Sequence, residues 1–213
     1  MMAVIAVLFI PFIYLALIYG QLPETVPTHF NLEGVADGYS NKTTLIYLTF
    51  FLSVVSVGTF LLIKNLHKID PKKAAGQSPE LLTKISCSML IFMCAIMLII
   101  IHSSEAGSLN GAHLIFAAIG LMLGVLGNLM HSIKPNYFIG FRLPWTLESE
   151  ENWRKTHQLV SKIWVAGGSL ITIITLLLDD SLAIKISLFI IVLLVVIPVY
   201  YSFNLYQKNN KPK

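Results

Sequence analysis

Charged residues are scarce in this chain. Asp, Glu, Lys and Arg make up 12% of its 213 residues, and 55% are hydrophobic. Average usage in soluble domains is about a quarter charged. The mean hydropathy is correspondingly high, at +0.74. Such a composition argues against a soluble catalytic domain and predicts that the protein has the lipid bilayer as its solvent.

Charge is absent altogether from the interiors of six apolar segments. Each approaches the roughly 20 residues that an α-helix needs to cross the hydrocarbon core of a bilayer. We therefore predict an all-α fold, a polytopic transmembrane bundle of about six spans. The third and fifth segments are the shortest, and Pro11 and Pro198 should kink the first and last helices without ending them. The segments are residues 2–20, 43–63, 85–101, 112–130, 163–178 and 186–203.

Basic residues are few outside three of the connecting segments. Of the 15 Lys and Arg residues in the chain, 13 lie in the stretches that follow the second, fourth or sixth apolar segment. Only Lys42 and Lys185 lie in connections on the opposite side of the membrane. The positive-inside rule then predicts that both termini are cytoplasmic. The first segment lacks a basic region before it, so we expect a retained helix rather than a cleaved signal peptide. No separate basic domain is present, and we expect no direct nucleic-acid partner.

The sequence also lacks recognisable catalytic and metal-binding patterns. His-Glu-x-x-His and Gly-x-Ser-x-Gly are both absent, and Cys87 and Cys94 lie about 10 Å apart along one helix, too far to form a disulfide. His29 has acidic neighbours only at irregular spacing, which is weak evidence for a metal site. We predict no enzyme activity, no catalytic residue, no cofactor and no metal.

The first distinctive loop is residues 21–42, predicted to lie outside the membrane. Two prolines hold it extended, and four residues favour turns. We expect a compact cap in which Phe30, Leu32, Val35 and Tyr39 pack onto the membrane face. The cap is either a surface that meets an extracellular ligand or an ordered connector. The proline and turn positions are Pro23, Pro27, Asn31, Gly34, Asp37 and Gly38.

The second distinctive loop is residues 131–162, predicted to be cytoplasmic. Its first half is irregular and aromatic, so we expect it in the headgroup region or folded back between helices. Its second half should be a helix, capped by Thr146 or Ser149, that continues into the fifth span. Arg142 is a candidate for binding lipid phosphate, a carboxylate of the loop or a partner protein. Pairing with Glu148, Glu150 or Glu151 is an equal alternative, and His157 is more readily interpreted as packed than as catalytic.

Small residues form a stripe on the fourth span, at Gly120, Gly124 and Gly127. Gly167 and Gly168 form a similar small surface on the fifth span. Such stripes permit close contact between helices. Intramolecular packing is the simpler interpretation, and a homo-oligomer is the alternative.

At these two loops the chain resembles the SdpI-type immunity protein family of bacterial membrane proteins. The second loop carries that family's long signature, and the first resembles a domain of uncharacterised function that often precedes it. Leu143 and Gln158 depart from the usual pattern. The signature positions are Gly127, Asn128, Asn136, Gly140, Arg142, Pro144, Trp145, Thr146, Leu147, Trp153, Thr156 and His157, and those of the first loop are Leu22, Pro23, Pro27, Thr28, His29, Phe30, Asn31, Gly34, Asp37, Gly38 and Lys42.

The resemblance implies a multi-pass protein of the bacterial inner membrane that gives resistance to a secreted antimicrobial peptide toxin. It also implies signalling, by sequestering a cytoplasmic transcriptional repressor. The expected partners are membrane lipid, a peptide toxin outside and a repressor at the cytoplasmic face, with the second-loop signature as the partner and signalling motif. The alternative is a transporter or exporter of a small solute or peptide, which the lack of ionisable residues in the spans disfavours.

The same patterns divide the chain into three parts. Residues 1–63 form an N-terminal two-helix unit with the loop 21–42. Residues 64–84 are a cytoplasmic linker. Residues 85–213 form a four-helix region that contains the loop 131–162.

Overall fold

The computed structural model describes residues 2–31, 36–69, 76–106 and 112–209. Helices dominate the described residues, as predicted, and a short hairpin follows the first helix. In chain order the elements are α1 (Met2–Ile18), β1 (Thr25–Phe30), β2 (Ala36–Asn41), α2 (Thr43–Lys64), α3 (Leu66–Ile69), α4 (Pro79–Ala106), α5 (Ala112–Met130), α6 (Pro144–Leu147), α7 (Glu150–Leu177) and α8 (Asp180–Asn209).

Six of these helices coincide with the six apolar segments. Four of them, α2, α4, α7 and α8, are long and apolar enough to cross a membrane, and shorter apolar helices cover Ala6–Ile18 and Leu114–Met130. The helical membrane bundle is thus confirmed, while the count of six spans and the side of the termini stay predictions. Pro11 and Pro198 lie inside continuous helices.

The two segments that the sequence makes shortest become long helices. α4 and α7 each have 28 residues. The reason is that each helix begins well before its apolar run, in a polar first turn that contains Glu80 or Glu150 and Glu151. Acidic side chains are favourable at a helix N-terminus because of the helix dipole. The length of the apolar segment alone therefore underestimates the length of both helices.

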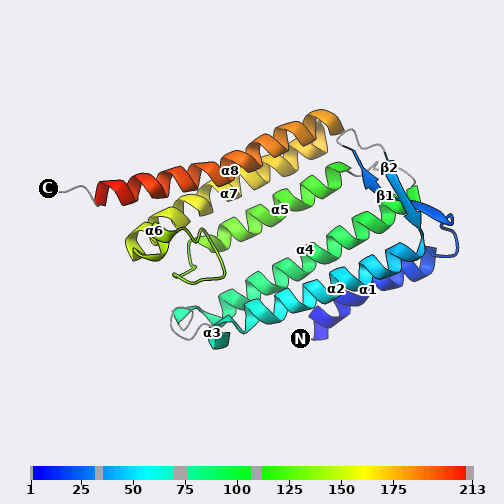
Figure 1. Ribbon diagram of the computed structural model, residues 1–213, viewed down its shortest axis with the longest axis horizontal. Helices are drawn as coiled ribbons and strands as arrows, with labels where there is room; N and C mark the ends of the chain where they lie inside the picture. The colour runs from blue at the N-terminus through cyan, green and yellow to red at the C-terminus, as the bar shows by residue number, and fades with distance from the viewer. Residues whose placement is uncertain (1, 32–35, 70–75, 107–111, 210–213) are drawn as a thin grey trace.

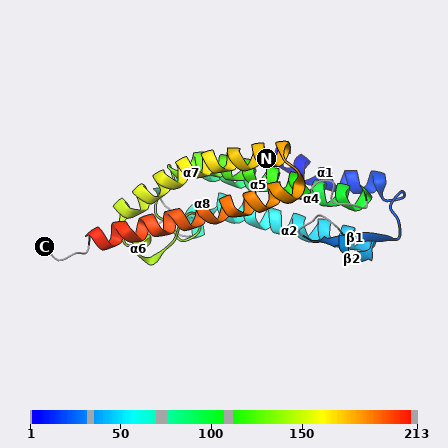
Figure 2. The ribbon, with the colours of Figure 1, turned by 90° about the horizontal axis from the view of Figure 1, so that it is seen from above.

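The helices form an elongated bundle whose two ends differ (Figure 1). One end, called here the hairpin end, carries β1 and β2. The other, the motif end, carries α3, α6 and residues 131–157, called here the motif segment. Seen from above, the bundle is a thin slab (Figure 2). The strongest packing joins α5 to α7, and α4 contacts α1, α2 and α5. α4 therefore links the N-terminal helices to the C-terminal ones.

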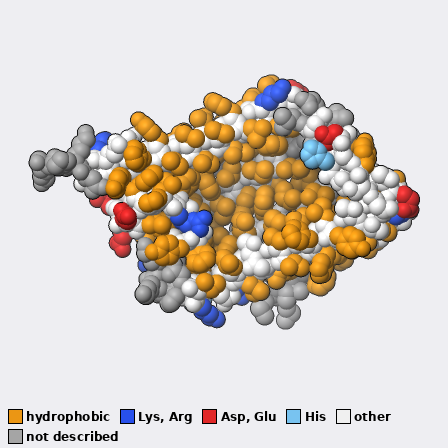
Figure 3. Space-filling model, in the orientation of Figure 1, with side chains coloured by type: hydrophobic (Ala, Val, Ile, Leu, Met, Phe, Trp, Pro, Cys, Tyr) orange, Lys and Arg blue, Asp and Glu red, His pale blue; other side chains and the backbone are white. Residues whose placement is uncertain are grey.

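The surface between the two ends is mostly hydrophobic. Figure 3 shows hydrophobic side chains over the middle of one face, with most charged side chains toward its edges. Large side chains such as Phe50 on α2, Leu177 on α7 and Phe189 on α8 are more than 60% exposed. Exposure on this scale is abnormal for a soluble protein and ordinary for a lipid-facing surface.

The hairpin is the part of the fold that we did not predict. β1 and β2 pair antiparallel, with irregular register around His29. Val26 and Leu22 are buried among Leu15, Leu45 and Ile101, so the loop does form a compact cap. Tyr39 is 61% exposed, and the packing of the apolar loop residues onto the membrane face stays a prediction. Leu32 and Val35 lie outside the described residues.

Glycines let α5 approach α7 closely. A Cβ atom added to Gly120 would lie 2.7 Å from the Gly168 carbonyl oxygen, and one at Gly127 would lie 2.8 Å from the Trp164 Cβ. Both contacts are shorter than real Cβ atoms tolerate. The small stripe on α5 thus serves intramolecular packing, and the homo-oligomer stays an untested prediction. Cys87 and Cys94 are both free thiols, as expected.

Candidate functional site

The motif segment is folded around the buried side chain of Asn136. Its Oδ1 accepts the backbone N–H groups of Phe138 and Ile139 at 2.8 and 2.7 Å. Its Nδ2 donates to the carbonyl oxygens of Lys134 and Ile139 at 2.9 and 3.1 Å. An Asn side chain that bonds its own backbone in this way replaces the regular hydrogen bonds that an irregular segment lacks. Asn136 therefore fixes the shape of the loop.

Gly140 is required by both its conformation and its surroundings. Its φ is +107°, in a region that residues with a Cβ atom rarely adopt. An added Cβ would also lie 2.2 Å from Nε2 of His157. The loop therefore passes directly over the imidazole of His157, and only glycine permits this approach.

His157 joins the loop to α7 with a defined tautomer. The Phe141 backbone N–H donates to Nε2 at 3.1 Å, so Nε2 carries no proton. Nδ1 carries it instead and donates to the Trp153 carbonyl oxygen at 2.8 Å. The ring is buried and stacks on Trp153 with centroids 4.0 Å apart. His157 is a packed, neutral, positioning residue, as the sequence suggested.

Trp153 is the largest fully buried side chain at this end of the bundle. Its Nε1 donates to the Ile133 carbonyl oxygen at 2.7 Å. The ring packs in a cluster to which α2, α3, α4, α5 and α7 contribute, and which includes Ile63, Leu82 and Met130. Trp153 thus joins the loop to the core of the motif end.

Short-range bonds shape the entry into α7. The buried Thr146 hydroxyl accepts the Leu143 N–H at 3.0 Å and donates to the Phe141 carbonyl at 2.6 Å. Pro144 begins α6, where a missing N–H is harmless. Ser149 is the N-cap of α7, and its Oγ accepts the Asn152 N–H at 3.2 Å. Of the two predicted caps, Ser149 therefore caps the long helix and Thr146 stabilises the turn before it.

Three side chains fasten the motif segment and α7 to α8. Nε1 of Trp145 donates to Oγ of Ser202 at 2.9 Å, and Nδ2 of Asn152 donates to the Ser202 carbonyl, also at 2.9 Å. The buried Thr156 hydroxyl in turn donates to Oδ1 of Asn152 at 3.1 Å. Asn152 was missed from the sequence, where one Asn beside two Glu residues carries no distinctive signal.

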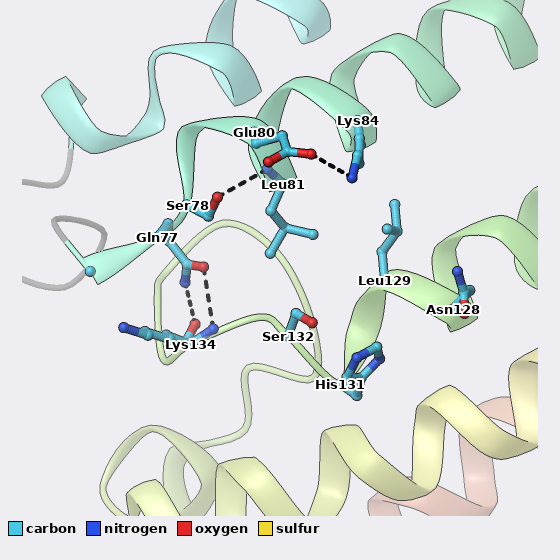
Figure 4. A pocket seen from close by; sticks show the side chains of 11 residues that line it. Gln77, Ser78, Glu80, Leu81, Lys84, Asn128, Leu129, His131, Ser132 and Lys134 are labelled. Atoms are coloured by element: carbon cyan, nitrogen blue, oxygen red, sulfur yellow. Dashed lines mark hydrogen bonds and ion pairs between the residues drawn. The ribbon is translucent and has the colours of Figure 1, made fainter.

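Gln77 was also missed, and it connects α4 to the motif segment. Its Nε2 donates to the Lys134 carbonyl at 2.5 Å, and its Oε1 accepts the Lys134 N–H at 3.3 Å (Figure 4). The side chain is buried although it precedes the helix in the predicted linker. No short-range pattern identifies it, because its partner is 57 residues away.

We expect Gln77→Ala to loosen the motif segment. It leaves the Lys134 backbone N–H without its partner, and the Lys134 carbonyl keeps only the bond from Asn136, an effect of about 1–3 kcal/mol. Faster amide hydrogen exchange at residues 133–139 of the detergent-solubilised protein would report this. Gln158→Ala, at an exposed position on α7, is the matched control and should leave exchange unchanged. Equal exchange in the two variants would contradict the role assigned to Gln77.

The exposed part of the motif segment is cationic and aromatic. Arg142 is exposed, and its Nη1 donates to the Tyr137 carbonyl oxygen at 2.6 Å. Among the described residues no ion pair joins it to Glu148, Glu150 or Glu151, so the structural pairing considered above is not formed. Tyr137 and Phe138 are 51% and 37% exposed. Asn128 does not join this loop but lies on an exposed side of α5, where it lines a cavity.

The hairpin residues form a second, separate group. His29 pairs with Asp37, and the Thr28 and Ser40 hydroxyls lie 3.2 Å apart across the strands. A Cβ atom on Gly38 would meet the Cβ of His29 at 2.9 Å. Pro27 accepts a hydrogen bond from Ser104 of α4 at its carbonyl, 3.3 Å away. Pro23 precedes β1, Phe30 ends it and Asn31 follows it exposed, while Gly34 lies outside the described residues.

Lys42 and Glu24 close the base of the hairpin. Their ion pair spans 2.9 Å, and the Lys42 ammonium also lies 5.1 Å from the centroid of the Tyr19 ring. Within the described residues no group of three or more His, Cys, Asp or Glu side chains is placed to hold a metal ion. The hairpin is therefore organised by paired side chains, and the absence of enzyme activity stays a prediction.

Comparison with known proteins gives three matches. Residues 132–203 match the model of the SdpI/YfhL protein family, and residues 6–54 match that of a domain of unknown function, DUF1648. The chain is 27% identical over 206 residues to a protein named "Immunity protein SdpI" from Bacillus subtilis (strain 168), covering 97% of this chain and 95% of that protein. No solved structure matches.

The two family matches cover the two features that the structure singles out. The SdpI/YfhL match contains most of the motif segment, all of α7 and most of α8. The DUF1648 match contains most of α1 and the whole hairpin. Together with the apolar helices they identify a multi-pass protein of the cell membrane. The chain therefore resembles the SdpI/YfhL protein family over residues 132–203, and the Bacillus subtilis immunity protein over nearly its whole length.

Proposed function

We propose that this chain is a bacterial immunity and sensing protein that gives resistance to a secreted antimicrobial peptide toxin. The hairpin end faces the outside and receives the peptide, and the motif end and both termini face the cytoplasm. Two observations support this. The related protein is named an immunity protein. The basic residues Lys64, Lys84, Lys134 and Arg142 belong to the motif end, whereas Lys42 lies beside the hairpin.

The observation that carries the proposal is that α4 runs from the hairpin end of the bundle to the motif end. It is continuous from Pro79 to Ala106. Near one end, the Ser104 hydroxyl lies 3.3 Å from the Pro27 carbonyl oxygen of the hairpin and 2.9 Å from that of Ile100 in its own helix, and it shares its proton between them. Just before the other, Gln77 holds the Lys134 backbone of the motif segment. A peptide that binds one arrangement of the hairpin end better than another would shift the motif segment through this helix.

The exposed face of the motif segment has the composition of a partner surface. Arginine and aromatic side chains are enriched at the energetically important positions of protein interfaces. Arg142, Tyr137 and Phe138 supply both kinds. We propose that a cytoplasmic transcriptional repressor binds here while toxin occupies the other end. The division of the chain into residues 1–63, 64–84 and 85–213 is part of the same proposal, in which α4 connects the N-terminal unit to the C-terminal region.

We expect Arg142→Ala to abolish protection. A sensitive bacterium that expresses the wild type should survive the peptide toxin encoded nearest to the gene, and the variant should not. Because Arg142 is exposed and bonds only a backbone carbonyl in the described structure, expression and folding should be normal. Arg154→Ala is the matched control, since it removes an exposed arginine of α7 at the same end.

Three results would contradict the proposal. If the wild type gives no protection although it is in the membrane, a transporter or a sensor of an unrelated ligand becomes the better interpretation. Equal protection by wild type and Arg142→Ala would remove the motif segment from the mechanism. Protection accompanied by active depletion of toxin from the cells would favour an exporter.

A further inference from the structure

Two hollows follow one another along the seam between α4 and α5. The first is a cavity of about 420 Å³ at the motif end, and Figure 4 shows α4 on one side of it and the end of α5 on the other. Its polar lining includes Gln77, Lys84, Asn128, His131, Ser132 and Lys134. The second is an apolar groove of about 230 Å³, lined by Ile91, Phe92, Ala95, Leu121, Met122 and Val125.

The helical repeat shows that both hollows lie on one face of each helix. On α4, the cavity residue Lys84 is followed by the groove residues Ser88, Ile91 and Ala95 at spacings of four, three and four. Residues three or four apart are neighbours on a helix surface. α5 repeats the pattern with the groove residues Ala118, Leu121 and Val125 and the cavity residue Asn128. One turn of helix, about 5 Å, therefore separates the polar cavity from the apolar groove.

The charge of the cavity favours an anion. Glu80 is already paired with Lys84, whose ammonium lies 2.7 Å away. Lys134 has no ion pair among the described residues, its backbone is fixed by Gln77, and its side chain extends beside Gly76, on the side of the cavity away from Ser132 and His131 (Figure 4). Asn128, His131 and Ser132 add hydrogen-bonding groups (Figure 4). A phosphate group suits this combination of several polar side chains and one ammonium that has no ion pair in the described part of the chain.

We propose that the seam binds one anionic phospholipid, with its phosphate in the cavity that Lys134, His131 and Ser132 line and one acyl chain along the groove. A polar cavity joined to an apolar groove matches a lipid, whereas a free anion would leave the groove unused. The site opens among the basic residues of the motif end, where anionic headgroups are attracted.

The test is native mass spectrometry of the full-length protein in a non-ionic detergent. Phosphatidylglycerol and phosphatidylcholine with identical acyl chains are added separately, and glycerol phosphate is added as a competitor. We expect the wild type to retain phosphatidylglycerol in preference. Lys134→Gln should lower that retention about fivefold, which is the contribution of one lysine near an anionic surface. Lys68→Gln, an exposed lysine of α3 outside the cavity, should behave as wild type.

A second variant tests the groove independently of the charge. Ala118→Phe fills the groove and should reduce retention of both lipids, while Val192→Phe on the lipid-facing surface of α8 should not. The proposal is overturned if the wild type retains both lipids equally, if Lys134→Gln matches Lys68→Gln, or if Ala118→Phe matches Val192→Phe. Competition by glycerol phosphate at the lipid's own concentration would assign the cavity to a free phosphate instead. Elution as a single symmetric peak confirms that each variant is folded.

Discussion

Replacing Gly140 by alanine should open the motif segment and abolish protection. A residue with a Cβ atom at φ +107° is strained by about 1–2 kcal/mol, and the new methyl group would lie 2.2 Å from Nε2 of His157. To relieve the clash, the loop must give up the bond from Phe141 to that nitrogen. We expect the free energy needed to open the loop to fall by about 2 kcal/mol, which corresponds to a roughly thirtyfold rise in the population of the open loop.

Amide hydrogen exchange over residues 136–147 measures this opening directly. Gly124→Ala is the matched control, because a Cβ atom at Gly124 meets nothing within 4 Å and the residue is helical. That change should leave the loop unaltered and should slightly favour α5. If Gly140→Ala exchanged no faster than Gly124→Ala, the close approach of loop and imidazole would be refuted.

Replacing Trp153 by alanine should destabilise the whole motif end by about 3–5 kcal/mol, the range for large buried aromatic side chains. The change leaves a cavity in the core of the motif end and removes the hydrogen bond to the Ile133 carbonyl. It also removes the ring on which His157 stacks. The temperature at which the detergent-solubilised protein aggregates, followed by light scattering, should fall accordingly.

Two further variants separate the causes. Trp153→Phe keeps most of the packing and loses the N–H donor, so its effect should be smaller, about 1–3 kcal/mol. Phe189→Ala removes an aromatic ring that is 63% exposed on α8, and it should be nearly neutral. An aggregation temperature for Trp153→Ala equal to that of Phe189→Ala would show that Trp153 does not hold the helices together.

The helices were predictable because lipid leaves the backbone few alternatives. Every peptide group in the hydrocarbon region needs an internal partner, so an apolar segment of sufficient length becomes a helix. This explains why the six apolar segments coincide with α1, α2, α4, α5, α7 and α8. The polar first turns of α4 and α7 were harder to place, since only local capping and the helix dipole favour them.

The hairpin was not predictable from the same patterns. Its turn residues are consistent with several loops, and the pairing of β1 with β2 is fixed by side chains that contact α1, α2 and α4. Tyr39, which we expected on the membrane face, is exposed, and Leu22 and Val26 are the loop residues that are buried. Burial in a short loop depends on which face meets the helices, and residue type alone does not determine that face.

The sequence by itself determined the membrane environment, the six helical segments and the residues of the family signature, because these depend on composition, length and short spacing. Only the tertiary structure decided what the signature residues do. Asn136, Thr146, Trp153 and His157 face inward and hold the loop, while Arg142 remains exposed. Gln77 and Asn152 acquired their roles in the same way, since hydrogen bonds between residues 50 or more positions apart exist only once the helices have packed.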